Sequence, residues 1–372
     1  MKKISTQNSA EYHRVFNFSS GPGCVPLPVL EKAKRDLLSH DGAGMSIMEM
    51  SHRSPQFEEI LAKAETGIRS LMSIPPSYGV LFLQGGASMQ FSMVPMNLLT
   101  NGGTADYIVT GAWGAKAVKE AGRFGNAAII FDGSDRAYRS VPQQNDVSIS
   151  TGAAYVHYTS NETIDGVEFP YDVDGRGAAV ICDASSNILS KPFDISKYDL
   201  IYAGAQKNIG PSGVTVVIIR KELLERIPKG LPTLLDYRSF AENGSMPNTP
   251  NTWGIYMIGL VCDWLTDFGG VEAIAKVNSA KAKLLYEAID SSDGFYTGCA
   301  DHGSRSRMNV TFRLPNDELD EKFAMLAEKE EMSGLRGHRS VGGIRASIYN
   351  AFPIEGVEKL VDFMSEFAAE NR

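Results

Sequence analysis

The stretch DLIYAGAQKNIGPSGVTVVIIR (Asp199–Arg220) decides the fold. It contains an apolar segment, a polar loop that carries Lys207, and a second apolar segment, VTVVIIR, a pattern that predicts two buried strands. A lysine between buried strands is poorly hydrated, which lowers its pKa and frees the amine to form a Schiff base with a carbonyl. Lys207 is therefore a candidate anchor for an aldehyde cofactor. The alternative, a solvated turn lysine, is common in loops.

A second residue, Asp183, ends the apolar segment AAVICD one predicted strand upstream. Pyridoxal phosphate needs a lysine that binds its aldehyde and an acid that keeps its ring nitrogen protonated. A strand-end aspartate followed by a strand-end lysine supplies both groups. Asp183 could instead cap the following turn, as aspartate often does. The presence of both Asp183 and Lys207 favours a pyridoxal-phosphate enzyme. A binding module that uses the fold without catalysis would be expected to have lost one of these two residues.

Motifs spread from Phe16 to Ala351 carry a resemblance to a known family. They are FNFSSGPG, MSHRSP, FLQGGASMQF, SNETIDG, DASSN, GAQKNIGPSG, NTPNTW and GHRSVGGIRASIYNA. In these motifs and their order the chain resembles the phosphoserine aminotransferase family over nearly its whole length. The resemblance implies an α/β protein of fold type I, with a mainly parallel seven-stranded sheet flanked by helices and a smaller C-terminal α/β domain.

The order of elements predicts where the domains begin and end. Strand and helix patterns alternate through the first two thirds of the chain, which is typical of a parallel α/β sheet. From about Gly269 the pattern changes to amphipathic helices around a strand, MNVTFRLP. We therefore expect an N-terminal arm at 1–15, a large cofactor domain at 16–268 and a small domain at 269–372.

Composition limits the partners. The chain has 372 residues, 43% of them hydrophobic, and a net charge of −8, so it has no basic footprint for nucleic acid or an anionic membrane. It shows no apolar run of about 18 residues and no signal-peptide pattern, which predicts no membrane span. The four cysteines lack zinc-ligand spacing, so we expect no metal, and reduced thiols in a cytoplasmic enzyme.

A glycine turn, Gly85-Gly86, follows the strand YGVLFL and precedes an apolar helical segment. Such a turn presents free N–H groups and the positive end of a helix dipole, which suits a phosphate. The motif is neither GxGxxG nor GxxxxGKS, which disfavours a dinucleotide or a nucleoside triphosphate. The resemblance assigns Ala87 and Ser88 to the cofactor phosphate, although turns of this kind are common without a ligand.

Other cofactor contacts follow from the resemblance. Trp113 would stack on the pyridine ring, although core packing is the usual place of a tryptophan. Thr163 would bond the phenolic oxygen, and Gln206 the phosphate. Asn248 and Thr249 would reach the phosphate in the neighbouring subunit, which implies a homodimer with shared active sites. Their loop also predicts a cap for the helix that follows.

Two N-terminal segments are candidate substrate contacts. His52 and Arg53 come just before a predicted helix start, with Ser54 as the N-cap, where helix amides and cations could together hold an anion. The resemblance makes Arg53 a clamp for the distal phosphate or carboxylate, with His52 beside it, and Ser20 a substrate contact in the loop SSGPG. A solvated turn and an ordinary entry loop are the alternatives.

The stretch GLRGHRSVGGIRASIYN gathers cations in an otherwise acidic chain. By resemblance Arg345 grips the amino acid's α-carboxylate with its two-pronged guanidinium, while His338 and Arg339 lie at the phosphate end of the substrate. Each could equally be a solvated loop residue.

The implied reaction is the exchange of O-phospho-L-serine and 2-oxoglutarate with 3-phosphohydroxypyruvate and L-glutamate in serine biosynthesis. The resemblance leaves open a further role in pyridoxine biosynthesis, through 4-phosphohydroxy-L-threonine. Two rivals of the same fold are disfavoured. A cysteine desulfurase needs a reactive cysteine in a basic setting, which no cysteine here has, and an alanine–glyoxylate type enzyme would not need so many cations.

Overall fold

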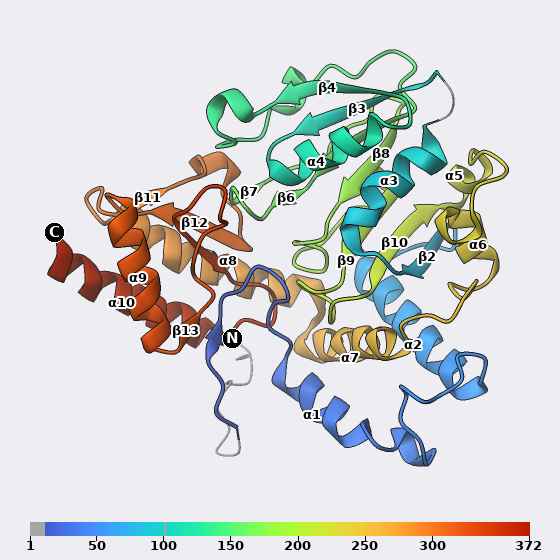
Figure 1. The fold of residues 1–372 in the computed structure, drawn as a ribbon, viewed down its shortest axis with the longest axis horizontal. Helices are drawn as coiled ribbons and strands as arrows, with labels where there is room; N and C mark the ends of the chain where they lie inside the picture. Colours follow the sequence, from blue (N-terminus) through green and yellow to red (C-terminus); the bar gives the residue numbers. More distant parts are fainter. Residues whose placement is uncertain (1–11, 100–101) are drawn as a thin grey trace.

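Figure 1 shows the chain in a computed structural model that describes residues 12–99 and 102–372. Most of the predicted N-terminal arm at 1–15 lies outside the described residues. In the described part of the arm, His13 Nε2 lies 3.1 Å from Glu331 Oε1, which belongs to the C-terminal third of the chain.

A seven-stranded sheet forms the centre of the molecule. In spatial order its strands are β2 (Tyr78–Leu83), β10 (Thr215–Arg220), β9 (Leu200–Gly204), β8 (Ala179–Asp183), β5 (Tyr155–Thr159), β3 (Thr104–Val109) and β4 (Asn126–Asp132). β10 runs antiparallel to both of its neighbours, and every other adjacent pair is parallel. The predicted mainly parallel sheet is confirmed.

The pairing of β2 joins distant parts of the sequence. Leu83 lies opposite Thr215, and Tyr78 opposite Arg220. Among the residues that the structure describes, β10 is the sole neighbour of β2 in this sheet, and the other five strands all lie between the two in sequence.

Helices cover both faces of the sheet (Figure 1). One face packs on α1 (Leu27–Asp36), α2 (Pro55–Met72) and α7 (Thr252–Phe268), and the other on α3 (Gly86–Leu98), α4 (Ala112–Ala121), α5 (Lys221–Glu225) and α6 (Tyr237–Glu242). The alternation of side chains along β10 explains the two cores. Val216 and Ile218 belong to the first hydrophobic cluster, and Val217 and Ile219 to the second.

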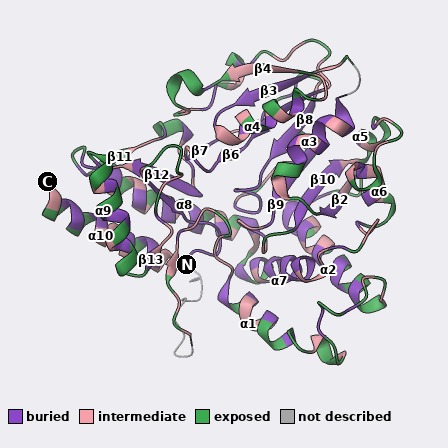
Figure 2. Ribbon diagram, viewed as in Figure 1, coloured by how far each residue is buried: buried purple, intermediate pink, exposed green. Residues whose placement is uncertain are grey.

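Local signals account for several helix boundaries. Ser54 Oγ accepts the N–H of Phe57 at 3.3 Å, so the predicted N-cap of α2 is confirmed. α1 has Pro28 in its first turn and ends at Asp36. α7 packs against α2 and is buried along most of its length, as Figure 2 shows. Within the described part of the chain, no helix has the length and apolar character needed to cross a membrane.

The C-terminal part has its own hydrophobic cluster. It contains the sheet β11 (Thr297–Gly298), β12 (Asn309–Arg313) and β14 (Ile344–Ser347), with helices α8 (Gly270–Asp290), α9 (Asp317–Lys329) and α10 (Ile354–Asn371). β1 (Phe16–Asn17) pairs in parallel with β13 (Met332–Ser333), and Phe18 is fully buried in this same cluster. An N-terminal segment therefore packs with the C-terminal third, while the division at residue 269 stays a prediction.

A short hairpin connects the central sheet to the C-terminal part. It consists of β6 (Asn161–Glu162) and β7 (Val167–Glu168), joined by a turn. Asn161 Nδ2 donates to Asn309 Oδ1 at 2.8 Å, and Ser306 N donates to Gly166 O at 2.9 Å. Both contacts fix the hairpin beside β12, at the edge of the pocket described next.

Candidate active site

Lys207 and Asp183 meet at one end of the sheet. Asp183 is the last residue of β8, and Lys207 follows the end of β9, its parallel neighbour. Because carboxyl ends of parallel strands lie at the same edge, the two residues approach each other. Burial lowers the pKa of Lys207, against the nearby carboxylate of Asp183, and so favours a neutral, nucleophilic amine.

Asp183 is a buried carboxylate held in one orientation. Its Oδ1 accepts the N–H of Ser185 at 2.9 Å, and Ser185 Oγ in turn accepts the N–H of Gly204 at 3.1 Å. Burial raises the pKa of Asp183, while Lys207 and the hydrogen bonds from Ser185 oppose that rise. A cation placed beside it, such as a protonated ring nitrogen, would stabilise its ionised form.

Trp113 forms one wall of the pocket. It is the second residue of α4, and its indole Nε1 donates to Thr163 Oγ1 at 2.8 Å. Lys207 Nζ lies 5.7 Å from the centre of the indole ring. The ring therefore presents a flat apolar surface within reach of the candidate anchor.

The amino end of α3 forms a phosphate-sized cradle. Gly85 and Gly86 have φ of 91° and 67°, conformations that glycine adopts without a steric cost. They direct the first turn of α3, with Ala87 and Ser88, toward the pocket, so its N–H groups and the positive helix end face it. The predicted helix start after the glycine turn is confirmed.

Arg345 is a buried cation, and one of its N–H donors has no hydrogen-bond partner. It belongs to β14 and is 9% exposed, and its Nη1 donates to Thr163 O at 3.2 Å. Its Nε is buried without a hydrogen-bond partner. Burial lowers the pKa of Arg345, and burial together with the Arg345 charge lowers the pKa of His338, which lines the same pocket. An anionic ligand would satisfy both groups.

These residues line one cavity of about 220 Å³. The predicted residues that it brings together are Ser20, Ala87, Ser88, Trp113, Thr163, Asp183, Gln206, Lys207, His338 and Arg345. The remaining predicted residues do not line it. They are His52, Arg53, Asn248, Thr249 and Arg339.

Four of the five predicted residues outside the cavity lie at two places, and the fifth, Arg339, lies in the loop between β13 and β14. His52 and Arg53 precede α2, and Arg53 is exposed. Thr249 is exposed, and its carbonyl accepts Gln84 Nε2 at 3.1 Å just before the glycine turn of α3. The expected cap in this loop is present, because Asn251 Oδ1 accepts the N–H of Gly254 at 2.9 Å. In a single chain, His52, Arg53, Asn248 and Thr249 are therefore partly or fully exposed to solvent.

Sequence reasoning missed several residues that line the cavity. They are Gly21, Phe91, Thr159, Asn161, Ser185 and Ser186, whereas Gly86 belongs to the predicted glycine turn. Thr159 Oγ1 is buried without a partner, and Thr159 pairs with Asp183 across β5 and β8. Its position at the end of a parallel strand beside Asp183 was the signal that could have identified it.

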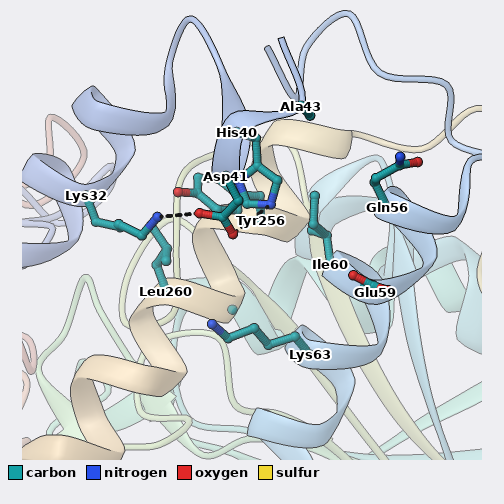
Figure 3. Close-up of a pocket in the computed structure, with 11 residues that line it drawn as sticks. Lys32, His40, Asp41, Ala43, Gln56, Glu59, Ile60, Lys63, Tyr256 and Leu260 are labelled. Atoms are coloured by element: carbon teal, nitrogen blue, oxygen red, sulfur yellow. Dashed lines mark hydrogen bonds and ion pairs between the residues drawn. The ribbon is translucent and has the colours of Figure 1, made fainter. Parts of the chain in front are cut away.

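A different pocket lies between the end of α1, η1 (His40–Gly42), α2 and α7 (Figure 3). None of the predicted site residues lines it. Lys32, which lines it, lies with its Nζ 3.3 Å from Asp41 Oδ1 in the pocket and 2.5 Å from Oδ2 of the neighbouring Asp36. Asp36, His40 and Asp41 are close enough to share a cation, but Lys32 already supplies the positive charge there.

The first cavity fits pyridoxal phosphate. It offers an amine of lowered pKa, a fixed buried carboxylate, a flat aromatic wall and a helix amino end for the phosphate. The unpartnered Thr159 Oγ1 and Arg345 Nε are buried polar atoms that a polar ligand would satisfy.

Comparisons with known proteins agree with this chemistry. Residues 15–360 match the family model described as aminotransferase class-V. Phosphoserine aminotransferase of Geobacillus kaustophilus is 52% identical over 354 residues, 95% of this chain and 98% of that protein. The solved phosphoserine aminotransferase of Bacillus circulans subsp. alkalophilus superposes with a TM-score of 0.95 at 48% identity, covering 96% of this chain and 99% of the other.

A third relative was solved with its cofactor. The structure of phosphoserine aminotransferase from Trichomonas vaginalis with bound pyridoxal phosphate has a TM-score of 0.90 and 38% identity, covering 95% of this chain and all (100%) of that one. Family model, sequence relatives and fold agree over nearly the full length. The chain is thus a pyridoxal-phosphate-dependent aminotransferase and belongs to the phosphoserine aminotransferase family.

Proposed function

We propose that this enzyme catalyses the reversible exchange of O-phospho-L-serine and 2-oxoglutarate with 3-phosphohydroxypyruvate and L-glutamate. The observation that carries the proposal is one cavity that combines an amine–carboxylate pair, Lys207 and Asp183, with two groups suited to anions, Arg345 and His338. Arg345 suits the α-carboxylate that every amino-acid substrate has, and His338 suits the charged distal group of phosphoserine and glutamate.

The protein's own groups have distinct tasks in this reaction. Pyridoxal phosphate, when bound, supplies an aldehyde that takes up the amino group and a ring that accepts electrons from the substrate's Cα. Lys207 Nζ removes and returns the Cα proton, which a neutral amine of lowered pKa can do. Asp183 keeps a ring nitrogen protonated, and Trp113 fixes the plane of the ring.

We assign the remaining cofactor contacts by position. Ala87, Ser88 and Gln206 hold the phosphate at the amino end of α3. Thr163 donates to the phenolic oxygen, which is consistent with its hydrogen bonding, since Oγ1 accepts from Trp113 Nε1 and its own proton remains available.

The substrate contacts follow the charges. Arg345 binds the α-carboxylate, supported by its buried Nε that lacks a partner. Ser20 lies beside it in the same cavity. His338 and Arg339 hold the distal phosphate or carboxylate, and both anions suit one cationic cluster, as alternating substrates require.

We further propose a homodimer in which each subunit completes the other's site. His52, Arg53, Asn248 and Thr249 are family site positions that do not line the cavity of one chain. The segment that leads to His52 and Arg53 also exposes apolar side chains, which is typical of an interface. They are Leu37, Leu38, Met45 and Met48.

Subunit complementation tests this arrangement. Arg53→Ala and Lys207→Ala chains are each expected to lose most activity. Heterodimers of the two regain activity when Arg53 acts across the interface, because one site then has both residues intact. Heterodimers that stay inactive would show that Arg53 serves its own chain or lies outside the site.

Two further assignments complete the proposal. We divide the chain into a large domain at 16–268 and a small domain at 269–372, supported by the separate hydrophobic cluster of the C-terminal part. We place the enzyme in the cytoplasm, supported by its cysteines, which are all free thiols.

The reaction itself is tested by the visible absorption of the purified holoenzyme. We expect O-phosphoserine to remove the band of the bound cofactor, and 2-oxoglutarate to restore it. A band that responds to alanine or aspartate but not to O-phosphoserine would contradict the substrate assignment while retaining the cofactor and Lys207.

A further inference from the structure

Glu162 is a fully buried carboxylate at the start of α4. The first N–H groups of a helix have no partner within the helix. Here Glu162 Oε2 accepts the N–H of Trp113 at 3.1 Å, and Glu162 Oε1 accepts the N–H of Gly114 at 2.7 Å. One side chain from the β6–β7 hairpin therefore satisfies two neighbouring donors of α4, and one of them belongs to Trp113.

Gly111 provides the space for this contact. A Cβ atom at Gly111 would lie 2.4 Å from Glu162 Cδ and 2.7 Å from Asp165 Oδ2, far inside contact distance. The φ of Gly111 is 177°, an extended conformation that any residue adopts, so the backbone itself does not require glycine. The close approach of the carboxylates requires it.

The same hairpin also holds the indole ring. Thr163, next to Glu162, accepts Trp113 Nε1 at 2.8 Å. Trp113 is thus bound at two points, its backbone N–H by Glu162 and its ring by Thr163. Two fixed points set the rotation of the residue and leave the ring centre 5.7 Å from Lys207 Nζ.

The hairpin is itself anchored away from α4. Glu168, opposite Asn161 on β7, contacts Lys191 at 2.8 Å and Arg307 at 3.2 Å. Burial raises the pKa of Glu162, while the N–H donors of Gly114 and Trp113 oppose that rise. A carboxyl group kept at such a desolvation cost is consistent with a specific role in local geometry.

We propose that Glu162 is a positioning residue for Trp113. Its carboxylate fixes the first turn of α4, and through it the indole plane against which the cofactor ring rests. The inference rests on the proposed role of Trp113, and deepens it by naming the group that sets its orientation.

The test uses protein labelled with ¹⁵N at tryptophan and freed of cofactor. The chain has three tryptophans, so the spectrum contains three backbone and three indole N–H signals, and Trp113→Phe assigns those of Trp113. In Glu162→Gln one end of the side chain becomes an N–H₂ donor that faces a backbone N–H, so one hydrogen bond is lost. We expect the Trp113 signals to shift while those of Trp253 and Trp264 stay in place.

Steady-state kinetics of the reconstituted holoenzyme give the second readout. We expect kcat to fall about ten- to a hundredfold in Glu162→Gln. The KM values of both substrates should change by less than about twofold, because Glu162 touches neither substrate and only the reacting geometry changes.

Glu168→Gln is the matched control, because Glu168 is also buried on the same hairpin but has its hydrogen bonds and ion pairs with Asn187, Lys191 and Arg307. We expect it to lower stability and leave the Trp113 signals unchanged. Trp113 signals at the wild-type position in Glu162→Gln would overturn the proposal. If Glu162→Gln does not fold, Glu162→Asp takes its place in the test. The shorter aspartate carboxylate cannot reach both N–H groups, so unshifted Trp113 signals in Glu162→Asp would equally overturn the proposal.

The two readouts separate this proposal from the role of Trp113. Shifted Trp113 signals with unchanged kcat would support the contact but contradict a catalytic consequence of it. The cofactor-free spectrum reports the Glu162–Trp113 contact whatever the reaction proves to be.

Discussion

Replacing Glu168 by glutamine removes a buried charge that ties the active-site hairpin to two other parts of the molecule. Glu168 Oε1 lies 2.8 Å from Lys191 Nζ and 3.2 Å from Arg307 Nη2, and Oε2 accepts the N–H of Arg307 at 3.0 Å. Burial alone would raise the pKa of Glu168, but the two cations and these hydrogen bonds lower it from 4.5 to about 2.

The size of the effect follows from that pKa. One pKa unit corresponds to about 1.4 kcal/mol, so the ionised side chain contributes about 3 kcal/mol to the free energy of unfolding. Since the folded pKa lies below the unfolded value, the contribution is fully present above about pH 4.5 and is lost as the pH falls toward 2. Glutamine also leaves two buried cations without their counter-charge, which adds to the loss.

Urea unfolding of wild type and Glu168→Gln at pH 7 and at pH 3.5, at equal protein concentration, measures the loss. We expect about 3 kcal/mol or more between the two proteins at pH 7 and a smaller difference at pH 3.5. Glu65→Gln is the control, because Glu65 and Arg69 form a partly exposed pair, 2.7 Å apart, within α2 and should contribute less than about 1 kcal/mol. Equal stability of Glu168→Gln and Glu65→Gln at pH 7 would refute the reasoning.

Three further substitutions test the site. Lys207→Ala should abolish turnover while circular dichroism shows an intact fold, and substantial turnover would exclude Lys207 as the proton-transfer group. Arg345→Ala should weaken both substrates by about 1.5–3 kcal/mol, since a buried charged hydrogen bond is lost, and unchanged KM values for both would place the α-carboxylate elsewhere. Gly111→Ala should displace Glu162 from α4 and lower kcat as Glu162→Gln does, because its Cβ would lie 2.4 Å from Glu162 Cδ. A Gly111→Ala enzyme with wild-type kcat would show that α4 tolerates the displacement.

The sequence predicted the central sheet well because its signals are local. Apolar runs such as YGVLFL and VTVVIIR correspond to β2 and β10, and the glycine turn marks the start of α3. The pairing of β1 with β13 was not foreseen, because each strand has two residues and no periodicity reveals a partner so far along the chain.

The site was predicted less completely, for two physical reasons. Asp183, Lys207 and Ala87 stand at strand ends and a helix start, where the topology of the sheet brings them together, whereas Ser20 and His338 come from loops and Arg345 from within β14. Arg53 and Thr249 carry the same motif signal, yet neither lines the cavity of one chain. Glu162 had no signal at all, because an acid in a polar turn resembles any turn residue until its burial is known.

The placement of β2 bears on how the enzyme is made. β2 and the phosphate cradle that follows it are synthesised early. The strand that pairs with β2 in the described sheet is β10, and β10 leaves the ribosome only after the other five strands. During synthesis the five parallel strands can assemble first, whereas β2 lacks a hydrogen-bonding partner until Arg220 has emerged. An incomplete chain that stops before β10 therefore leaves β2, and the phosphate cradle at its end, without the strand that pairs β2 into the sheet.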